Sequence, residues 1–364
     1  MPDSARHRRT GPRALAAIVA SAALLSLPAA AYASGNAPSR SGSVSNSTNL
    51  AGTTAVATAG AFAYAPSYGT GVLTAVNLSN PASPVVAGTS ASAPSLMNST
   101  NIAISGGDAF VVSKNRNAST TNNDDGTGNS LTILSLANPA VPTIVASLHD
   151  PTNLFGAYGI AISGSDAFIA AQGCLSGQPC PNAAVGNSFA VVNVANPNAP
   201  TLVTALHNSS LPAPWAGALD HATSVAISGN FAYVTAAYSS RLTVINIANP
   251  AAPTIVASLH DPTNLPFPVD VAVQGNYAYV ADQSGASEFT VVNIANPSNP
   301  TVVGTITNSA LSGAYRTKVS GDYAFVSGSS AAAMSVIDIS QPTKPVIVWS
   351  DTDQAHFWRT TGLS

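Results

Sequence analysis

Apolar and polar positions repeat along this chain with a long period. From about residue 51 onward the same order returns: a short apolar stretch, a glycine, then aromatic residues alternating with alanine. The glycines that open this alternation are spaced 46, 58, 65, 46 and 46 residues apart. They are Gly60, Gly106, Gly164, Gly229, Gly275 and Gly321. The chain therefore contains six copies of one unit, with insertions in the second and third copies.

Each copy predicts four short strands. In the fourth copy these strands are residues 225–227, 231–235, 242–247 and 254–259, which are rich in Val, Ile, Thr and aromatic residues. The glycine between the first two strands supplies the positive φ of a tight hairpin. A P-x-x-P segment separates the third strand from the fourth, because proline lacks the N–H donor that a central strand needs. The asparagine before it can brace this turn with a side-chain hydrogen bond.

Both faces of these strands are apolar. Val244 and Ile245 are neighbours in the chain, so they point to opposite faces of their strand, and both faces need cover. A sandwich buries one face of each sheet, whereas a propeller blade has a neighbour on each side. We therefore expect an all-β fold, a β-propeller of six four-stranded antiparallel blades. Seven blades and a parallel β-helix are the alternatives.

A family resemblance follows from these repeats. The string L-T-V-I-N-I-A-N-P-A-A-P-T-I-V at residues 242–256 resembles the LVIVD repeat, as does G-N-Y-A-Y-V-A-D at residues 275–282. The resemblance extends over residues 51–351. It implies propeller blades in an exported bacterial protein. It implies no reaction and no catalytic residues.

The two ends of the chain predict further segments. Residues 1–33 read as a secretory signal peptide, with early arginines, an apolar stretch and an Ala-Tyr-Ala cleavage signature; a membrane anchor is the alternative. Residues 34–50 form an N-terminal segment with a possible closure strand. Residues 43–47 match the end of a fourth strand at 305–309, so we expect residues 41–48 to add to, or lie beside, the last blade. Residues 352–364 are a C-terminal tail.

Charge narrows the partners and the compartment. Charged residues make up 7% of the chain and hydrophobic residues 46%. Removing residues 1–33 leaves 8 basic and 14 acidic residues with no basic run. Nucleic acid is therefore not an expected partner. We expect a secreted protein, periplasmic, extracellular or on the cell surface, with no membrane span after signal removal.

The two insertions carry candidate chemistry. Cys174 and Cys180, the only cysteines, lie in the third copy and are expected to form a disulfide in an oxidising compartment. Asp124 and Asp125 lie in the oxygen-rich insertion of the second copy, which could hold Ca²⁺. The spacing of an EF-hand is absent, so a polar loop without metal is the alternative. No other cofactor is expected.

Three histidines directly follow predicted fourth strands. His149 and His260 lie in identical thirteen-residue stretches and precede Asp-Pro, and His207 holds the same place in the third copy. They are candidate ligand contacts. Packed sheets are about 10 Å apart, so histidines on different blades are not expected to share one site. An Asp-Pro turn into the next blade is the alternative interpretation.

The predicted channel-lining strands carry polar residues. Five residues before the glycine, equivalent positions hold Asn101, Ser224, Asp270 and Arg316. Asp270 and Arg316 belong to adjacent copies and could form an ion pair. Trp215 lies in a separate insertion, where it could anchor a protein or a sugar, or pack over the channel mouth.

No catalytic signature is evident. The chain has no G-x-S-x-G, no H-E-x-x-H, no phosphate-binding glycine loop, and a single glutamate, Glu288. We expect an exported propeller that binds a protein or carbohydrate partner through its loop insertions. A hydrolase or lyase with its site at the channel mouth and a structural cell-surface component are the alternatives.

Overall fold

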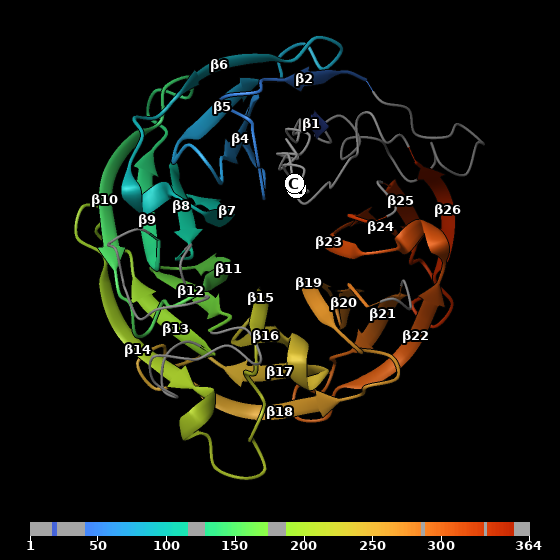
Figure 1. Cartoon of the computed structure of the whole chain (residues 1–364). Coiled ribbons are helices and arrows are strands. Elements are labelled where there is room, and N and C mark those ends of the chain that lie inside the picture. The colour runs from blue at the N-terminus through green and yellow to red at the C-terminus, as the bar shows by residue number, and fades with distance from the viewer. Residues whose placement is uncertain are drawn as a thin grey trace, which may run out of the picture.

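Six four-stranded antiparallel sheets surround a central axis (Figure 1). In this computed structural model, the described residues are 17–19, 41–115, 128–173, 187–284, 288–330 and 333–352. The sheets follow the chain from one to the next, so each repeat folds as one blade. The predicted six-bladed propeller is confirmed, and the alternatives of a β-helix and of seven blades are not.

The first strand of each blade lies nearest the axis and the fourth forms the outer rim (Figure 1). Blade 1 comprises β3 (Ala57–Ala59), β4 (Phe62–Pro66), β5 (Leu73–Asn77) and β6 (Val85–Thr89). Blade 2 comprises β7 (Ser99–Ser105), β8 (Asp108–Ser113), β9 (Ser130–Ser135) and β10 (Thr143–His149). Blade 3 comprises β11 (Ala157–Ser163), β12 (Asp166–Ala171), β13 (Ser188–Asn193) and β14 (Thr201–His207).

The later blades repeat this order. Blade 4 comprises β15 (Ala222–Ser228), β16 (Phe231–Ala236), β17 (Arg241–Asn246) and β18 (Thr254–His260). Blade 5 comprises β19 (Pro268–Gln274), β20 (Tyr277–Asp282), β21 (Glu288–Asn293) and β22 (Thr301–Thr307). Blade 6 comprises β23 (Ala314–Ser320), β24 (Tyr323–Gly328), β25 (Ala333–Asp338) and β26 (Val346–Asp351). Short 3-10 turns lie between strands at η2 (Pro94–Leu96), η3 (Asn208–Ser210), η4 (Ala237–Ser239) and η5 (Ser309–Leu311).

The repeated glycine makes the first hairpin of each blade. Gly229 has a φ of 56° and Gly275 a φ of 57°, and the equivalent glycines of the other four copies are also left-handed. The P-x-x-P segments form the turns before the fourth strands, as expected. In blade 4, Asn249 Oδ1 accepts the Ala251 N–H at 3.2 Å, so the asparagine braces that turn.

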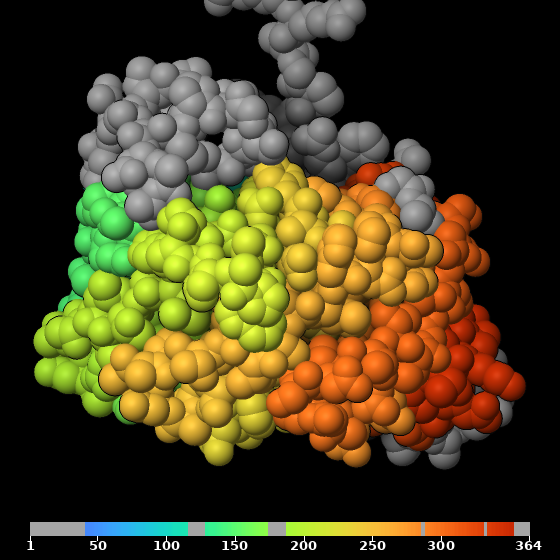
Figure 2. Space-filling view, turned by 90° about the horizontal axis from the view of Figure 1, so that it is seen from below, coloured from blue at the N-terminus to red at the C-terminus, as the bar shows by residue number. Residues whose placement is uncertain are grey.

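In the edge-on view, the blades follow one another around the outside in chain order (Figure 2).

Aromatic residues of one blade pack against alanines of the next. Phe168 of blade 3 shares a buried cluster with Ala232 of blade 4. Tyr233 of blade 4 meets Ala278 of blade 5 in the same way, and Tyr279 of blade 5 meets Ala324 of blade 6. The alternation along the second strand therefore places a large side chain opposite a small one at successive junctions, which keeps the interior close-packed.

One junction differs from the others. Each of the five junctions from blade 1 to blade 6 along the chain has an apolar cluster with residues of both blades. At the sixth junction, the described residues form two separate clusters. Leu50, Val76 and Leu78 belong to the blade 1 cluster, and Phe325 and Val336 belong to the blade 6 cluster.

The N-terminal segment does not extend the last blade. The strand β2 (Ser43–Ser45) pairs with β1 (Ala17–Val19), and the sheet of blade 6 ends at β26. The expectation that residues 41–48 add to the sheet of the last blade is therefore wrong, and the alternative that they lie beside that blade stays a prediction. The physical reason is apolar cover, because Val44 packs against the Leu50 and Leu78 side of blade 1. In the described part of the chain, no helix is long and apolar enough to cross a membrane.

Candidate functional site in the central channel

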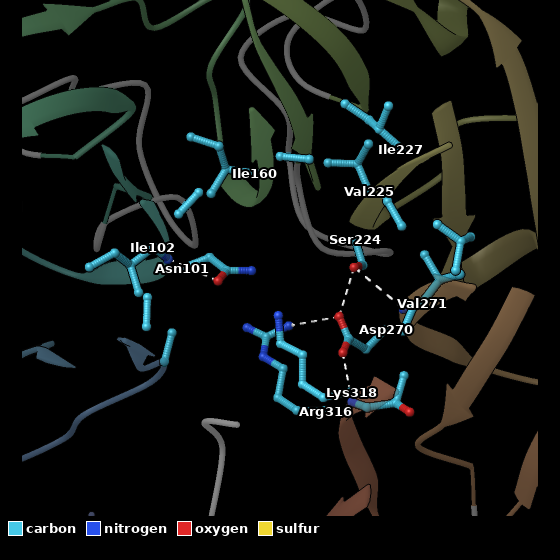
Figure 3. Close-up of a pocket in the computed structure, with 18 of the residues that line it drawn as sticks. Asn101, Ile102, Ile160, Ser224, Val225, Ile227, Asp270, Val271, Arg316 and Lys318 are labelled. Atoms are coloured by element: carbon cyan, nitrogen blue, oxygen red, sulfur yellow. Dashed lines mark hydrogen bonds and ion pairs between the residues drawn. The ribbon is translucent and has the colours of Figure 1, made fainter. Parts of the chain in front are cut away.

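A cavity of about 460 Å³ occupies the central channel (Figure 3). The innermost strands of all six blades line it. Most of the residues that line it are Ala, Ile and Val, such as Ile160, Val225 and Val271, yet the surface exposed to the cavity is more polar than apolar. A charge or hydrogen bond counts for more where it is buried away from water.

Asp270 lies at the centre of a polar layer across the channel. Its Oδ1 accepts the Ser224 hydroxyl at 2.7 Å, and its Oδ2 accepts the Thr317 N–H at 2.8 Å. The Nη1 atom of Arg316 lies 3.5 Å from Asp270 Oδ1, so the expected ion pair is present (Figure 3). Asp270 is 6% exposed and Arg316 5% exposed. Blades 4, 5 and 6 are thus joined through one carboxylate.

Arg316 also reaches across the channel. Its Nη2 donates to the Thr100 carbonyl of blade 2 at 3.2 Å. Its guanidinium carbon lies 5.6 Å from the ring centre of Tyr158 in blade 3. The position in blade 1 that corresponds to Arg316 is Ala55, which leaves room for this crossing. Asn101 lines the same cavity, and its Oδ1 accepts the Ile102 N–H at 2.9 Å. The four polar residues predicted from the repeat therefore share one cavity.

Sequence reasoning missed Lys318, which lines the cavity two residues after Arg316 (Figure 3). Its side chain is exposed. The other five copies have alanine at this position, and these residues are Ala57, Ala103, Ala161, Ala226 and Ala272. The replacement of this repeated alanine by lysine in one copy was the sequence signal that could have identified Lys318. Two cations and one carboxylate now line the cavity, so its walls carry a net positive charge.

Beyond the polar layer, the channel end away from the glycine hairpins is aromatic and basic. A β-bulge interrupts the first strand of blades 2 to 6, and in blade 3 the bulged residue is Tyr158. Bulges re-aim a side chain. The Nζ atom of Lys114 lies 5.3 Å from the ring centre of Tyr158. At the same end, His221 stacks on Tyr238 at 4.0 Å between ring centres.

Burial shifts the pKa of both basic groups at this end. Burial, together with the nearby Lys114 charge, lowers the pKa of His221 to about 4, against a hydrogen bond to the Gln172 backbone that favours the charged ring. Burial also lowers the pKa of Lys114. The His221 imidazole is therefore neutral at pH 7. The sequence analysis did not single out either residue.

Blade 5 holds two buried carboxyl groups that face each other. Asp282 and Glu288 are register partners at the ends of β20 and β21. Burial, then the charges of Asp282 and Asp261, raise the pKa of Glu288 to about 7. Burial raises the pKa of Asp282, although its oxygens accept the Phe267 and Ser284 N–H groups. Two negative charges on paired residues repel each other, which favours protonation of one of the two carboxyl groups.

The three predicted histidine positions lie on the outer rim, away from the cavity. His149, His207 and His260 end β10, β14 and β18, one on each of three blades. Nδ1 of His149 lies 2.8 Å from the Gly128 carbonyl oxygen, and His207 Nε2 lies 3.0 Å from Asn153 Oδ1. They do not share a site, and their role as ligand contacts stays a prediction. Asp261 accepts backbone N–H groups from Thr263 and Asn264, which is the expected Asp-Pro turn.

The remaining candidates are separate from the channel or lie outside the described residues. Trp215 is half-buried in the loop after η3, where its backbone N–H donates to the Pro212 carbonyl. Trp215 does not line the cavity. Asp124, Asp125, Cys174 and Cys180 lie outside the described residues. Among the residues that are described, no group of three or more His, Cys, Asp or Glu could hold a metal ion.

Comparison with known proteins supports the repeat assignment. The LVIVD repeat matches residues 220–261, 269–308 and 313–352, so the C-terminal half of the chain carries three LVIVD repeats. No protein of curated function matches the sequence.

Solved structures show the same fold at low identity. A candidate 6-phosphogluconolactonase from Bacteroides fragilis has a TM-score of 0.65 and 11% identity, covering 89% of this chain and 90% of that chain. A periplasmic gluconolactonase from Pseudomonas aeruginosa has a TM-score of 0.63 and 12% identity, covering 86% and 88%. A streptogramin B lyase has a TM-score of 0.59 and 10% identity, covering 85% and 86%. At these identities the likeness shows the fold alone.

Proposed function

We propose that this LVIVD-repeat propeller is an exported binding protein whose central channel takes a small carboxylated sugar. The observation that carries the proposal is the charge of the cavity wall. Among the residues that line the cavity, Arg316 and Lys318 are the cations and Asp270 is the one carboxylate, which pairs with Arg316. Arg316 is already paired, so Lys318 is the cation that would meet a carboxylate.

The size and chemistry of the cavity support a small ligand. A volume of about 460 Å³ lies within the range of small-molecule sites. The amide of Asn101 offers hydrogen bonds to sugar hydroxyls, while the alanine and valine side chains of the lining suit the apolar face of a sugar ring. Of the two partners expected from the sequence, a protein or a carbohydrate, the proposal takes the carbohydrate and specifies an anionic one.

Isothermal titration of the purified protein with D-gluconate and D-glucuronate tests this proposal, with sorbitol and D-glucose as neutral controls. The informative variant is Lys318→Ala, because alanine occupies the same position in the other five repeats and the blade accommodates it. We expect Lys318→Ala to weaken binding of the two acids by at least about tenfold, since one charge-assisted hydrogen bond contributes about 1.5–3 kcal/mol.

Lys344→Ala is the matched control, because this substitution removes the same charge and Lys344 is exposed in the proline turn of the same blade. Its affinity for the acids should equal that of the wild type. Equal binding of acids and neutral sugars would overturn the proposal, as would unchanged binding by Lys318→Ala or no binding at all.

An enzyme acting on a related sugar lactone is the second candidate. The observation that favours it is the fold shared with a gluconolactonase and a candidate 6-phosphogluconolactonase. The test is hydrolysis of glucono-δ-lactone followed by pH-stat titration against the uncatalysed rate. An Asp270→Asn variant as slow as the uncatalysed reaction would support it, and a wild-type rate equal to the uncatalysed rate would exclude it.

A further inference from the structure

One position of the repeat has a left-handed backbone in most blades. It lies eight residues before the hairpin glycine, and φ there is positive in five copies. Three of these residues are glycine and one is asparagine, which tolerate this conformation: Gly52, Gly156, Gly313 and Asn98. The fifth is His221, with a φ of 58°. The repeat thus has an imidazole where four other copies have glycine or asparagine, and the remaining copy has Phe267 without the positive φ.

The His221 ring is enclosed but incompletely bonded. The residue is 5% exposed and stacks on Tyr238, with Phe267 6.4 Å away between ring centres. Its Nδ1 is buried and has no hydrogen-bond partner. A hydrogen bond to the Gln172 backbone favours the charged ring, so its acceptor is the carbonyl, and Nε2 is the donor because Nδ1 has no partner. A neutral ring bonded in this way leaves Nδ1 as an acceptor for a group that donates.

Lys114 supplies a charge beside this acceptor. It lies eight residues after the hairpin glycine of blade 2, where the other copies carry uncharged residues: Tyr68, Gln172, Ala237, Gln283 and Ser329. Its charge acts on His221, and its Nζ lies over the Tyr158 ring. Aromatic rings around a half-buried cation limit its hydration, so an anion that reaches it is bound more strongly than in water.

We infer that His221 and Lys114 form a second ligand site, which takes a hydroxy acid with an aromatic part. The ligand hydroxyl donates to His221 Nδ1, and its carboxylate pairs with Lys114. The aromatic part packs among the rings of Tyr158, Tyr238 and Phe267. This site lies beyond the Asp270–Arg316 layer from the cavity of the proposed function, and it does not depend on that function.

Three related probes separate the two contacts. 3-Phenyllactate carries both groups, 3-phenylpropionate lacks the hydroxyl, and 3-phenylpropane-1,2-diol lacks the carboxylate. We expect calorimetry at pH 7 to show about tenfold tighter binding of 3-phenyllactate than of either analogue, the difference that one good hydrogen bond or ion pair makes. In protein labelled with ¹⁵N-histidine, the His221 Nδ1 resonance should move on addition of 3-phenyllactate.

Variants assign each preference to a residue. His221→Asn puts in the residue found at the equivalent Asn98, so the backbone is retained, and it should abolish the preference for 3-phenyllactate over 3-phenylpropionate. Lys114→Met should abolish the preference over the diol, and the exposed Lys344→Met should keep both preferences. Equal affinity for all three probes, a preference that survives His221→Asn, or an unmoved Nδ1 resonance in the wild type would overturn the inference.

Discussion

At the scale of single residues, the paired carboxyl groups of blade 5 couple stability to pH. Glu288 is 5% exposed and lies opposite Asp282. Because its pKa rises from 4.5 to about 7 on folding, the folded protein holds a proton that the unfolded chain releases. Binding of this proton therefore contributes to the stability of the folded state in full below about pH 4.5, and the contribution is lost as the pH rises through about 7.

Glu288→Gln should remove this dependence. The amide keeps the size of the side chain but cannot ionise, so we expect the variant to be about 1–2 kcal/mol more stable than wild type at pH 8 and nearly equal at pH 5, after discounting for solvent screening. Urea denaturation at both pH values measures it. Asp322→Asn, an exposed site in blade 6, should leave the difference between the two pH values as in the wild type, and identical curves for Glu288→Gln and wild type at pH 8 would contradict the prediction.

Internal comparison of the repeats accounts for what could be predicted of the candidate site. Counting five residues before the hairpin glycine identified Asn101, Ser224, Asp270 and Arg316, and the structure places all four in one cavity. The same counting at other positions distinguishes Lys318 from the alanine of the other five copies and His221 from the glycine or asparagine of four copies. The contact between Arg316 and Thr100 could not be predicted, because it crosses the channel between repeats that are not neighbours.

At the scale of elements, hydroxyl groups in third strands tie each blade to the chain before it. Thr243 Oγ1 donates to the Ala218 carbonyl at 2.6 Å, and Thr290 Oγ1 donates to the Asn264 carbonyl at 2.6 Å. Thr74 makes the equivalent bond to the Asn49 carbonyl at 2.7 Å. These bonds hold the segment that leads from one blade to the next against the following blade.

Thr243→Val should cost about 1–3 kcal/mol of stability, because the near-isosteric methyl leaves the buried Ala218 carbonyl without its donor. Chemical denaturation measures the loss. Thr254→Val, at an exposed position that begins β18, is the matched control and should change stability by less than about 0.5 kcal/mol. A loss no larger for Thr243→Val than for Thr254→Val would show that water replaces the bond.

The strands themselves could be predicted, but their irregularities could not. The predicted strand 231–235 is observed as Phe231–Ala236, and 254–259 as Thr254–His260. The bulges in the first strands leave no mark in the apolar pattern, because they arise where strands converge on the axis. They matter for the site, since they set the direction of Tyr158 and Tyr315.

At the scale of the whole molecule, closure of the ring is the step that identical repeats do not specify. Each repeat encodes a blade and its contact with the next, so five junctions follow from one pattern. The sixth must join the first repeat to the last, and the described residues there form separate apolar clusters on blade 1 and blade 6. Arg316 donates to the Thr100 carbonyl and so ties blade 6 directly to blade 2 across the channel.

Opening of the ring should therefore begin at this junction. The middle strands β4 and β5 of blade 1, and β24 and β25 of blade 6, are bonded on both sides like β16 and β17 of blade 4. A difference in their hydrogen exchange would thus report blade packing rather than the sheet ladder. We expect amides of blades 1 and 6 to exchange at least about tenfold faster than those of blade 4, equivalent to about 1.4 kcal/mol of opening free energy. Mass spectrometry of peptic fragments measures the rates, and equal protection of the three blades would show a ring that opens only by global unfolding.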